Sequence, residues 1–169
     1  MERRTVSESR SVLVQWMGPS DANAAGFVHG GTVMKLCDEA AATAAIRHAR
    51  LRVVTAAVDR MTFLAPVHVG ELLMLQSSVN AVWRTSMEVG VRVEAEDPLT
   101  GERRHTNSAF ITMVAVDDSG HPAPIPGLRC ESPEEQRRER AAQMRRTNRL
   151  AEREELVRHR EREHELPAR

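Results

Sequence analysis

The segment from Gly30 to Arg50 constrains the fold more than any other part of the chain. It contains no proline and is dominated by alanine, and its apolar residues recur at helical spacing: Val33, Leu36, Cys37, Ala40 and Ala44. This spacing predicts one long helix with a buried face. Because small side chains let another layer of backbone approach closely, we expect a sheet to wrap around this helix.

Strand-like stretches flank the predicted helix. A short apolar, β-prone stretch precedes it at residues 11–17, and four more follow it, at residues 52–64, 71–83, 86–96 and 103–116. In residues 86–96 apolar and polar side chains alternate, which predicts that one face of that strand is exposed to solvent. A strand, a helix and then consecutive antiparallel strands indicate an α+β fold.

The composition changes abruptly after Gly127, because Arg and Glu dominate from Glu134 onward. Ser132, Pro133 and Glu135 are typical of a helix start, as N-cap, first helical residue and capping-box partner. The segment beyond them is either a solvated helix docked on the domain or a loosely attached, partly disordered tail. We therefore expect an N-terminal tail at 1–10, one domain at 11–128 and a charged helical extension at 129–169.

The overall composition argues against several classes of protein. The chain has 24 Lys and Arg against 24 Asp and Glu, no Tyr and few other aromatic residues, so nucleic acid is not an expected partner. No apolar run approaches the ~20 residues that span a bilayer, and the N-terminus lacks a signal-peptide pattern. Two cysteines are too few for a disulfide framework. We expect a cytoplasmic protein without a membrane association.

An acid in the middle of a buried helix needs an explanation. Asp38 is either a structural carboxylate, which pairs with an arginine or caps neighbouring backbone, or a functional one, since an unpaired buried carboxylate costs several kcal/mol. Gly30 and Gly31 at the helix start leave first-turn N–H groups free to bind an oxygen, although they also suit an ordinary helix start. Asn23, just upstream, is either a turn residue or a group that orients water or substrate.

The spacing between these residues predicts how they combine. Asp38 lies eight residues beyond Gly30, which is about 12 Å along a helix axis, too far for both to act on one carbonyl. If two copies of the helix run antiparallel across a two-fold axis, Asp38 of one copy faces Asn23, Gly30 and Gly31 of the other. A functional Asp38 therefore predicts an obligate dimer with two shared sites.

Two motifs carry a family resemblance. They are N-x-x-G-x-x-H-G-G-x-x-x-x-x-x-D at residues 23–38 and V-T-x-x-V-D-x-M-x-F at residues 54–63. With RTSMEVGVRVEAE and HTNSAFITMVAVDDSGHPAPIPGL further along, the region from about Val12 to Leu128 resembles the hotdog-fold acyl-CoA thioesterases. The resemblance is greatest to the group that contains brain-type acyl-CoA hydrolase and its single-domain bacterial relatives.

The resemblance implies a fold, an activity and an assembly. The hotdog fold is a five-stranded antiparallel sheet wrapped around one long central helix, paired into a dimer and often into a trimer of dimers. Members hydrolyse fatty acyl-CoA without a metal or cofactor. The family's catalytic Asp and Asn correspond to Asp38 and Asn23. Some members have tandem halves that each lack one of these residues, whereas this chain keeps both.

The implied chemistry assigns roles to residues of both motifs. We expect Asp38 to act as general base on water, or alternatively as a nucleophile, while an N–H of Gly30 or Gly31 polarises the thioester carbonyl and Asn23 positions water or substrate. The residues that match the family's coenzyme A contacts, each also compatible with an ordinary surface or strand role, are His29, Thr55, Arg60, Arg84 and Ser86.

The remaining titratable residues fit structural roles. His29 is an alternative base, but its position beside two glycines favours a role in shaping the loop or lining the coenzyme A channel. Cys37 should face the core, and Asp59 fits a structural role better than a catalytic one. Three histidines are too far apart in sequence to show metal-ligand spacing: His68, His105 and His121.

Two other functions stay open at this point. One is a hotdog dehydratase or hydratase acting on acyl thioesters, usually with a histidine base. The other is a non-catalytic hotdog module that binds acyl-CoA, with the charged C-terminal helix contacting a protein partner.

Overall fold

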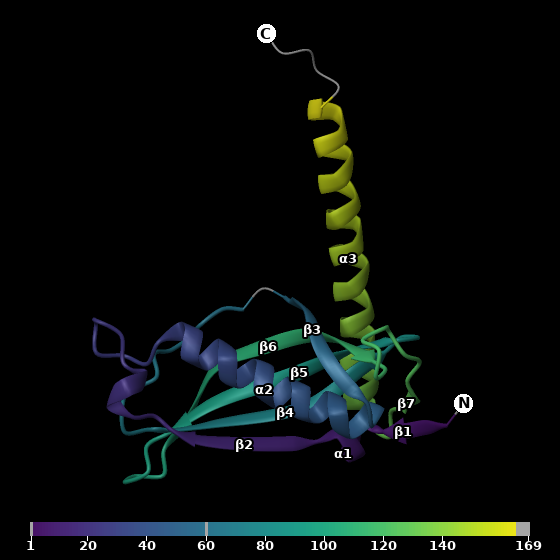
Figure 1. Ribbon diagram of the computed structural model, residues 1–169. Coiled ribbons are helices and arrows are strands. Elements are labelled where there is room, and N and C mark those ends of the chain that lie inside the picture. Colours follow the sequence, from purple (N-terminus) through teal and green to yellow (C-terminus); the bar gives the residue numbers. More distant parts are fainter. Residues whose placement is uncertain (1, 60, 165–169) are drawn as a thin grey trace.

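The computed structural model describes residues 2–59 and 61–164 (Figure 1). Its elements in chain order are β1 (Arg3–Thr5), α1 (Val6–Ser9), β2 (Ser11–Trp16), a 3-10 turn (Pro19–Asp21), α2 (Gly30–Ala49), β3 (Arg52–Val58), β4 (Leu72–Val82), β5 (Ser86–Glu96), β6 (Arg103–Val116), β7 (Gly127–Arg129) and α3 (Pro133–His164). The predicted helix at 30–50 and the five predicted strands are all present. The strand predicted at 52–64 ends at Val58, earlier than expected.

The five longer strands form one antiparallel sheet in the order β2-β4-β5-β6-β3. Helix α2 lies lengthwise against one face of this sheet (Figure 1). This is the predicted α+β architecture of a hotdog fold, a sheet around one long helix. Strands β2 and β3 form the two edges of the sheet.

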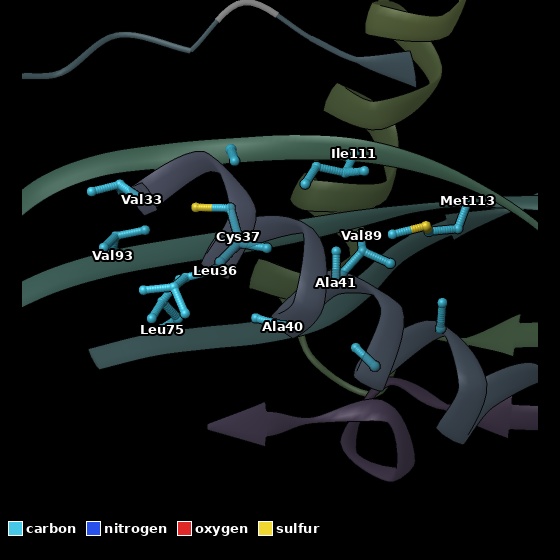
Figure 2. Packing of buried hydrophobic residues seen from close by; sticks show 14 of the residues in the cluster. Val33, Leu36, Cys37, Ala40, Ala41, Leu75, Val89, Val93, Ile111 and Met113 are labelled. Carbon is cyan, nitrogen blue, oxygen red and sulfur yellow. The ribbon is translucent and has the colours of Figure 1, made fainter. Parts of the chain in front are cut away.

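The core lies between α2 and the sheet. Figure 2 shows Val33, Leu36 and Cys37 of α2 among side chains from β4, β5 and β6. Further along α2, four alanines are fully buried: Ala40, Ala41, Ala44 and Ala45. Because a methyl group is the whole side chain at these positions, the strands can approach the helix backbone closely, as the alanine-rich sequence predicted.

The opposite face of the sheet is partly covered by α3, which corrects one prediction. Glu88 belongs to the polar set of β5 that should be exposed to solvent, yet its side chain is fully buried. The Arg145 guanidinium of α3 donates to both Glu88 carboxylate oxygens at 2.7 and 3.0 Å, and Asn80 Nδ2 donates to one of them at 3.1 Å. Alternation along one strand cannot indicate that a later helix covers its polar face.

Helix α3 begins as predicted. The backbone N–H of Glu135 donates to Ser132 Oγ, and the Glu135 carboxylate accepts the Ser132 N–H, both at 3.2 Å, which is a capping box. The beginning of α3 is docked, since Ala142 is fully buried. Within the predicted N-terminal tail the structure has β1, which pairs in parallel with β7 beside the α3 start, and α1.

Candidate active site

Asp38 and Thr55 meet on the surface of α2 that faces away from the core. Thr55 lies on the edge strand β3, and its hydroxyl donates to Asp38 Oδ1 at 2.5 Å. The Thr55 oxygen also lies 3.5 Å from the sulfur of Met113 on β6. The Asp38 side chain is half-buried and has no arginine partner among the described residues. Of the structural roles considered for Asp38, pairing with an arginine is therefore not seen in this part of the structure.

Exposed apolar side chains lie beside Asp38 and Thr55. Met34 lies one turn earlier on the same face of α2 and is 45% exposed, and Val58 of β3, on the same face of the strand as Thr55, is 43% exposed. Val54 is 50% exposed but points to the other face of the sheet. β3 is also an edge strand, whose outer side pairs with no other strand in the part of the chain that the structure describes. An edge strand with exposed valines is a surface on which a second chain can pair.

The start of α2 presents free N–H groups, as expected. His29 is the N-cap and its side chain makes no capping hydrogen bond. The His29 carbonyl accepts from the N–H groups of Thr32 and Val33. The N–H groups of Gly30 and Gly31 donate to no acceptor within the described residues. Since the helix dipole is positive at this end, these two N–H groups are suited to a carbonyl oxygen that gains negative charge.

An apolar pocket of about 330 Å³ lies beside this helix start. The Phe63 ring covers Gly30, and a Cβ added there would lie 3.5 Å from the ring. Phe63 belongs to the motif at residues 54–63, but nothing in that motif indicates that the ring turns back to the helix start. The pocket lining is Phe27, Val28, Gly30, Val33, Phe63, Leu64, Ala65, Pro66 and Val67.

Asn23 holds the loop before α2 and keeps its donors available. Its Oδ1 accepts the N–H groups of Ala25 at 2.9 Å and Phe27 at 3.2 Å. The carboxamide N–H groups have no acceptor among the described residues, so they can donate to water or to a carbonyl oxygen.

The structure brings some of the predicted site residues together and keeps others apart. Thr55 meets Asp38, whereas Asn23, Gly30 and Gly31 lie at the far end of α2. The helix is continuous from Gly30 to Asp38, so eight residues separate them by about 12 Å along its axis. Within one chain, the carboxylate and the free N–H groups cannot contact the same carbonyl carbon and oxygen.

The predicted coenzyme A contacts are placed unevenly. Arg84 is exposed on the connection between β4 and β5, and Ser86 is half-buried at the start of β5. Ser86 pairs with Val114 and Val114 with Val54, so Ser86 lies two strands from the β3 edge. His29 is exposed at the start of α2. Arg60 lies outside the described residues.

The other titratable groups have structural environments. Burial raises the pKa of the Cys37 thiol to about 11, and the Asp38 carboxylate next to it adds to the rise, so the thiol is not a nucleophile at neutral pH. Asp59 accepts from Arg149 of α3 at 2.9 and 3.1 Å, which is the structural role expected of it. Within residues 2–59 and 61–164 no three His, Cys, Asp or Glu side chains cluster to hold a metal ion, and no helix there could span a membrane.

The chain is similar to known thioesterases in sequence and in structure. The model of the thioesterase superfamily matches residues 25–102, which include Asp38 and Thr55. A rat protein named cytosolic acyl coenzyme A thioester hydrolase is 39% identical over 140 residues, 81% of this chain and 36% of that protein. The chain thus spans little more than a third of the length of the curated relatives that it matches first.

Two solved structures cover almost the whole chain. The apo crystal structure of a hexameric acyl-CoA thioesterase is 41% identical with a TM-score of 0.87, covering 90% of this chain and 97% of that one. An acyl-CoA hydrolase from Staphylococcus aureus, in complex with butyryl coenzyme A, coenzyme A and coenzyme A disulfide, is 33% identical with a TM-score of 0.86, covering 94% and 97%. Variants of that enzyme with an asparagine, an aspartate or a threonine replaced by alanine match equally well.

Proposed function

This chain belongs to the thioesterase superfamily, among the acyl-CoA thioester hydrolases, and from that premise we propose that it hydrolyses fatty acyl-CoA to a free fatty acid and coenzyme A. The observation that carries the proposal is the Asp38–Thr55 hydrogen bond on an apolar surface beside the unpaired edge of β3. The residue types replaced in the Staphylococcus aureus enzyme include the two that meet in this bond.

The proposed active unit is a homodimer formed along the β3 edges. A two-fold axis beside β3 makes the two α2 helices antiparallel neighbours, so the start of one helix lies near the middle of the other. Each site then combines Asp38 and Thr55 of one protomer with Asn23, Gly30 and Gly31 of the second. The exposed apolar side chains of Met34 and Val58 support this arrangement, because dimerisation would remove them from water.

The proposed reaction follows from these groups. The Asp38 carboxylate, oriented by the Thr55 hydroxyl, takes a proton from water as the water oxygen attacks the thioester carbon. An N–H at Gly30 or Gly31 of the second protomer donates to the carbonyl oxygen as it gains negative charge, and Asn23 donates to the water or the substrate. The coenzyme A thiolate leaves without a strong general acid, because a thiol is far more acidic than an alcohol.

Other parts of the proposal concern the substrate and the assembly. The apolar pocket beside Gly30 is the space next to the reacting carbonyl that can take an acyl group. Arg84, Ser86, His29 and Arg60 are the proposed contacts of the coenzyme A moiety, since arginine is suited to its phosphates. We propose a trimer of dimers as the complete assembly, no cofactor, and a cytoplasmic location, as the name of the rat relative states for that protein.

A thiol-release assay with acyl-CoA substrates of increasing chain length tests the proposal. The wild-type chain should release thiol, and Asp38→Asn should lower kcat by about 10²- to 10⁴-fold, the usual contribution of a general base. Glu39→Gln is the matched control, because Glu39 is the neighbouring acid but is paired with Lys35 at 3.2 Å on the surface. Tight acyl-CoA binding without thiol release would favour the non-catalytic module, and Asp38→Asn at wild-type rates would refute the assignment of the base.

A further inference from the structure

Helix α3 crosses the outer face of the sheet and continues beyond its β3 edge. Its contacts follow the strands in order: Gln143 accepts from Trp83 at 3.0 Å, Arg145 binds Glu88 of β5, and Arg149 binds Asp59, the residue after β3. Every described side chain from Ala151 to Glu161 is exposed. Figure 1 shows this distal part of α3 projecting past β3, away from the rest of the chain.

The distal part of α3 carries one apolar and charged strip. Leu150 and Val157 are 44% and 46% exposed, and Arg153 and Glu154 lie between them. These positions are three, four and seven residues apart, so all four side chains lie on one face of the helix. Neither Arg153 nor Glu154 has an ion-pair partner within the described residues. The strip thus presents a leucine and a valine at its ends and two opposite charges between them, all exposed.

We propose that this strip, defined as Leu150, Arg153, Glu154 and Val157, packs antiparallel against the same strip of a second copy of this chain. The strip is self-complementary. A two-fold axis between residues 153 and 154 places each Leu150 against Val157 of the other copy and each Arg153 against Glu154 of the other copy. Both apolar contacts and both opposite-charge contacts form at once, which no parallel arrangement of the same four residues provides.

The same axis can serve the dimer of the proposed function, on which this inference rests. Arg149 lies over the end of β3, and the midpoint between residues 153 and 154 is about 7 Å further along the helix. The two-fold axis between paired β3 strands would lie about 2.4 Å beyond β3, half of the usual strand spacing. Across the strands, the difference between these two positions lies within the reach of the Arg149 side chain, so a single axis for the α3 and β3 contacts is part of the proposal.

Disulfide trapping tests the strip in the full-length chain. Leu150→Cys with Val157→Cys, in a Cys130→Ser background, should form covalent dimers under mild oxidant. The two new cysteines lie about 10 Å apart on one helix, too far to pair within a chain. Asn148→Cys with Glu155→Cys is the matched control, because these exposed positions have the same spacing on the opposite face of α3. The control should give little covalent dimer.

Charge reversal provides a second measurement. Arg153→Glu places like charges opposite each other and should raise the dimer dissociation constant by a factor of a few, and adding Glu154→Arg should reverse the change, as expected of exposed ion pairs.

Thiol release separates the two proposals. A dimeric, active protein without trapping overturns the α3 contact alone, whereas an inactive monomer overturns the proposed function. If the native mass shows that the disulfides join separate dimers, the α3 and β3 contacts do not share one axis.

Discussion

At the scale of single residues, Thr55 is the group whose role the structure defines most closely. Its hydroxyl is the one donor from the described residues that is placed on the Asp38 carboxylate. A general base must hold its lone pair toward the water it activates, and a hydrogen bond to the other lobe of the carboxylate fixes that orientation. Thr55 is thus a positioning residue for the proposed reaction.

Replacing Thr55 by valine isolates that hydroxyl. Thr55→Val keeps the β-branched shape that suits a strand and removes the donor. We expect kcat to fall by about tenfold or more, since a hydrogen bond to a charged group is worth about 1.5 kcal/mol or more. Thr55→Ser, which keeps the hydroxyl, should recover most of the rate. Equal rates in the valine and wild-type enzymes would show that the bond does not assist Asp38.

His48 should make the stability of the chain depend on pH. Its ring is fully buried near the end of α2, and Nε2 donates to the Pro126 carbonyl at 2.9 Å, while Nδ1 has no hydrogen-bond partner among the described residues. Burial lowers the pKa of His48, and the Arg4 guanidinium adds to this, although the Pro126 carbonyl opposes it. The folded state therefore favours the neutral ring.

The sign of the effect follows from this lowered pKa. Below the ordinary imidazole pKa of about 6.5, the unfolded chain binds a proton at His48 that the folded chain resists, so stability falls as pH falls. Chemical denaturation at about pH 7.5 and about pH 5.5 measures the loss. His48→Gln keeps a donor for Pro126 without titrating and should reduce the difference. If His48→Gln loses the same stability between the two pH values as the wild-type chain, the loss comes from other titratable groups.

At the scale of elements, the contacts of α3 with the sheet include an ion pair whose carboxylate is fully buried. Glu88 is fully buried, and Arg145 binds both of its oxygens while its guanidinium lies 3.7 Å from the centre of the Phe110 ring. Asn80 completes the cluster, and a Cβ at Gly90 would lie only 2.6 Å from Asn80 Nδ2. Gly90 is therefore needed for Asn80 to reach Glu88.

Removing the arginine alone should be costly. Arg145→Met leaves a buried carboxylate without its charge partner, which costs up to about 3–5 kcal/mol of unfolding free energy. Release of α3 would let water reach Glu88 and limit that loss, so proteolysis of α3 should be measured beside denaturation. Arg140→Met, at a solvated position on the same helix, should change little. If both variants are equally stable, the cluster does not anchor α3.

The elements also show how far sequence reasoning reaches. Apolar spacing predicted α2 and the five main strands because each buries one face in one shared core. Apolar spacing did not predict β1, because β1 depends on pairing with β7 more than a hundred residues away. It did not predict the covered face of β5 either, because the burial of Glu88 depends on the distant Arg145. For the site, the spacing from Gly30 to Asp38 predicted their separation. It could not predict that Phe63 turns back over Gly30.

At the scale of the whole molecule, the central prediction is that neither protomer has a complete site. Asp38→Ala lacks the base, and Asn23→Ala lacks the donor at the other end of α2, so each variant should be weakly active as a homodimer. In a mixed dimer, one site takes Asp38 from the second variant and Asn23 from the first and is intact. The other site carries both substitutions.

Mixing the two variants should therefore restore activity. Unfolding and refolding equal amounts together gives half mixed dimers, each with one intact site of two, so thiol release should reach about 25% of the wild-type rate. Each variant refolded alone is the control for recovery. If Asn23 and Asp38 instead served one carbonyl within a single chain, every chain in the mixture would stay defective and no activity would return. Complementation thus tests the shared site through the pairing of chains, independently of how any single substitution affects the chemistry.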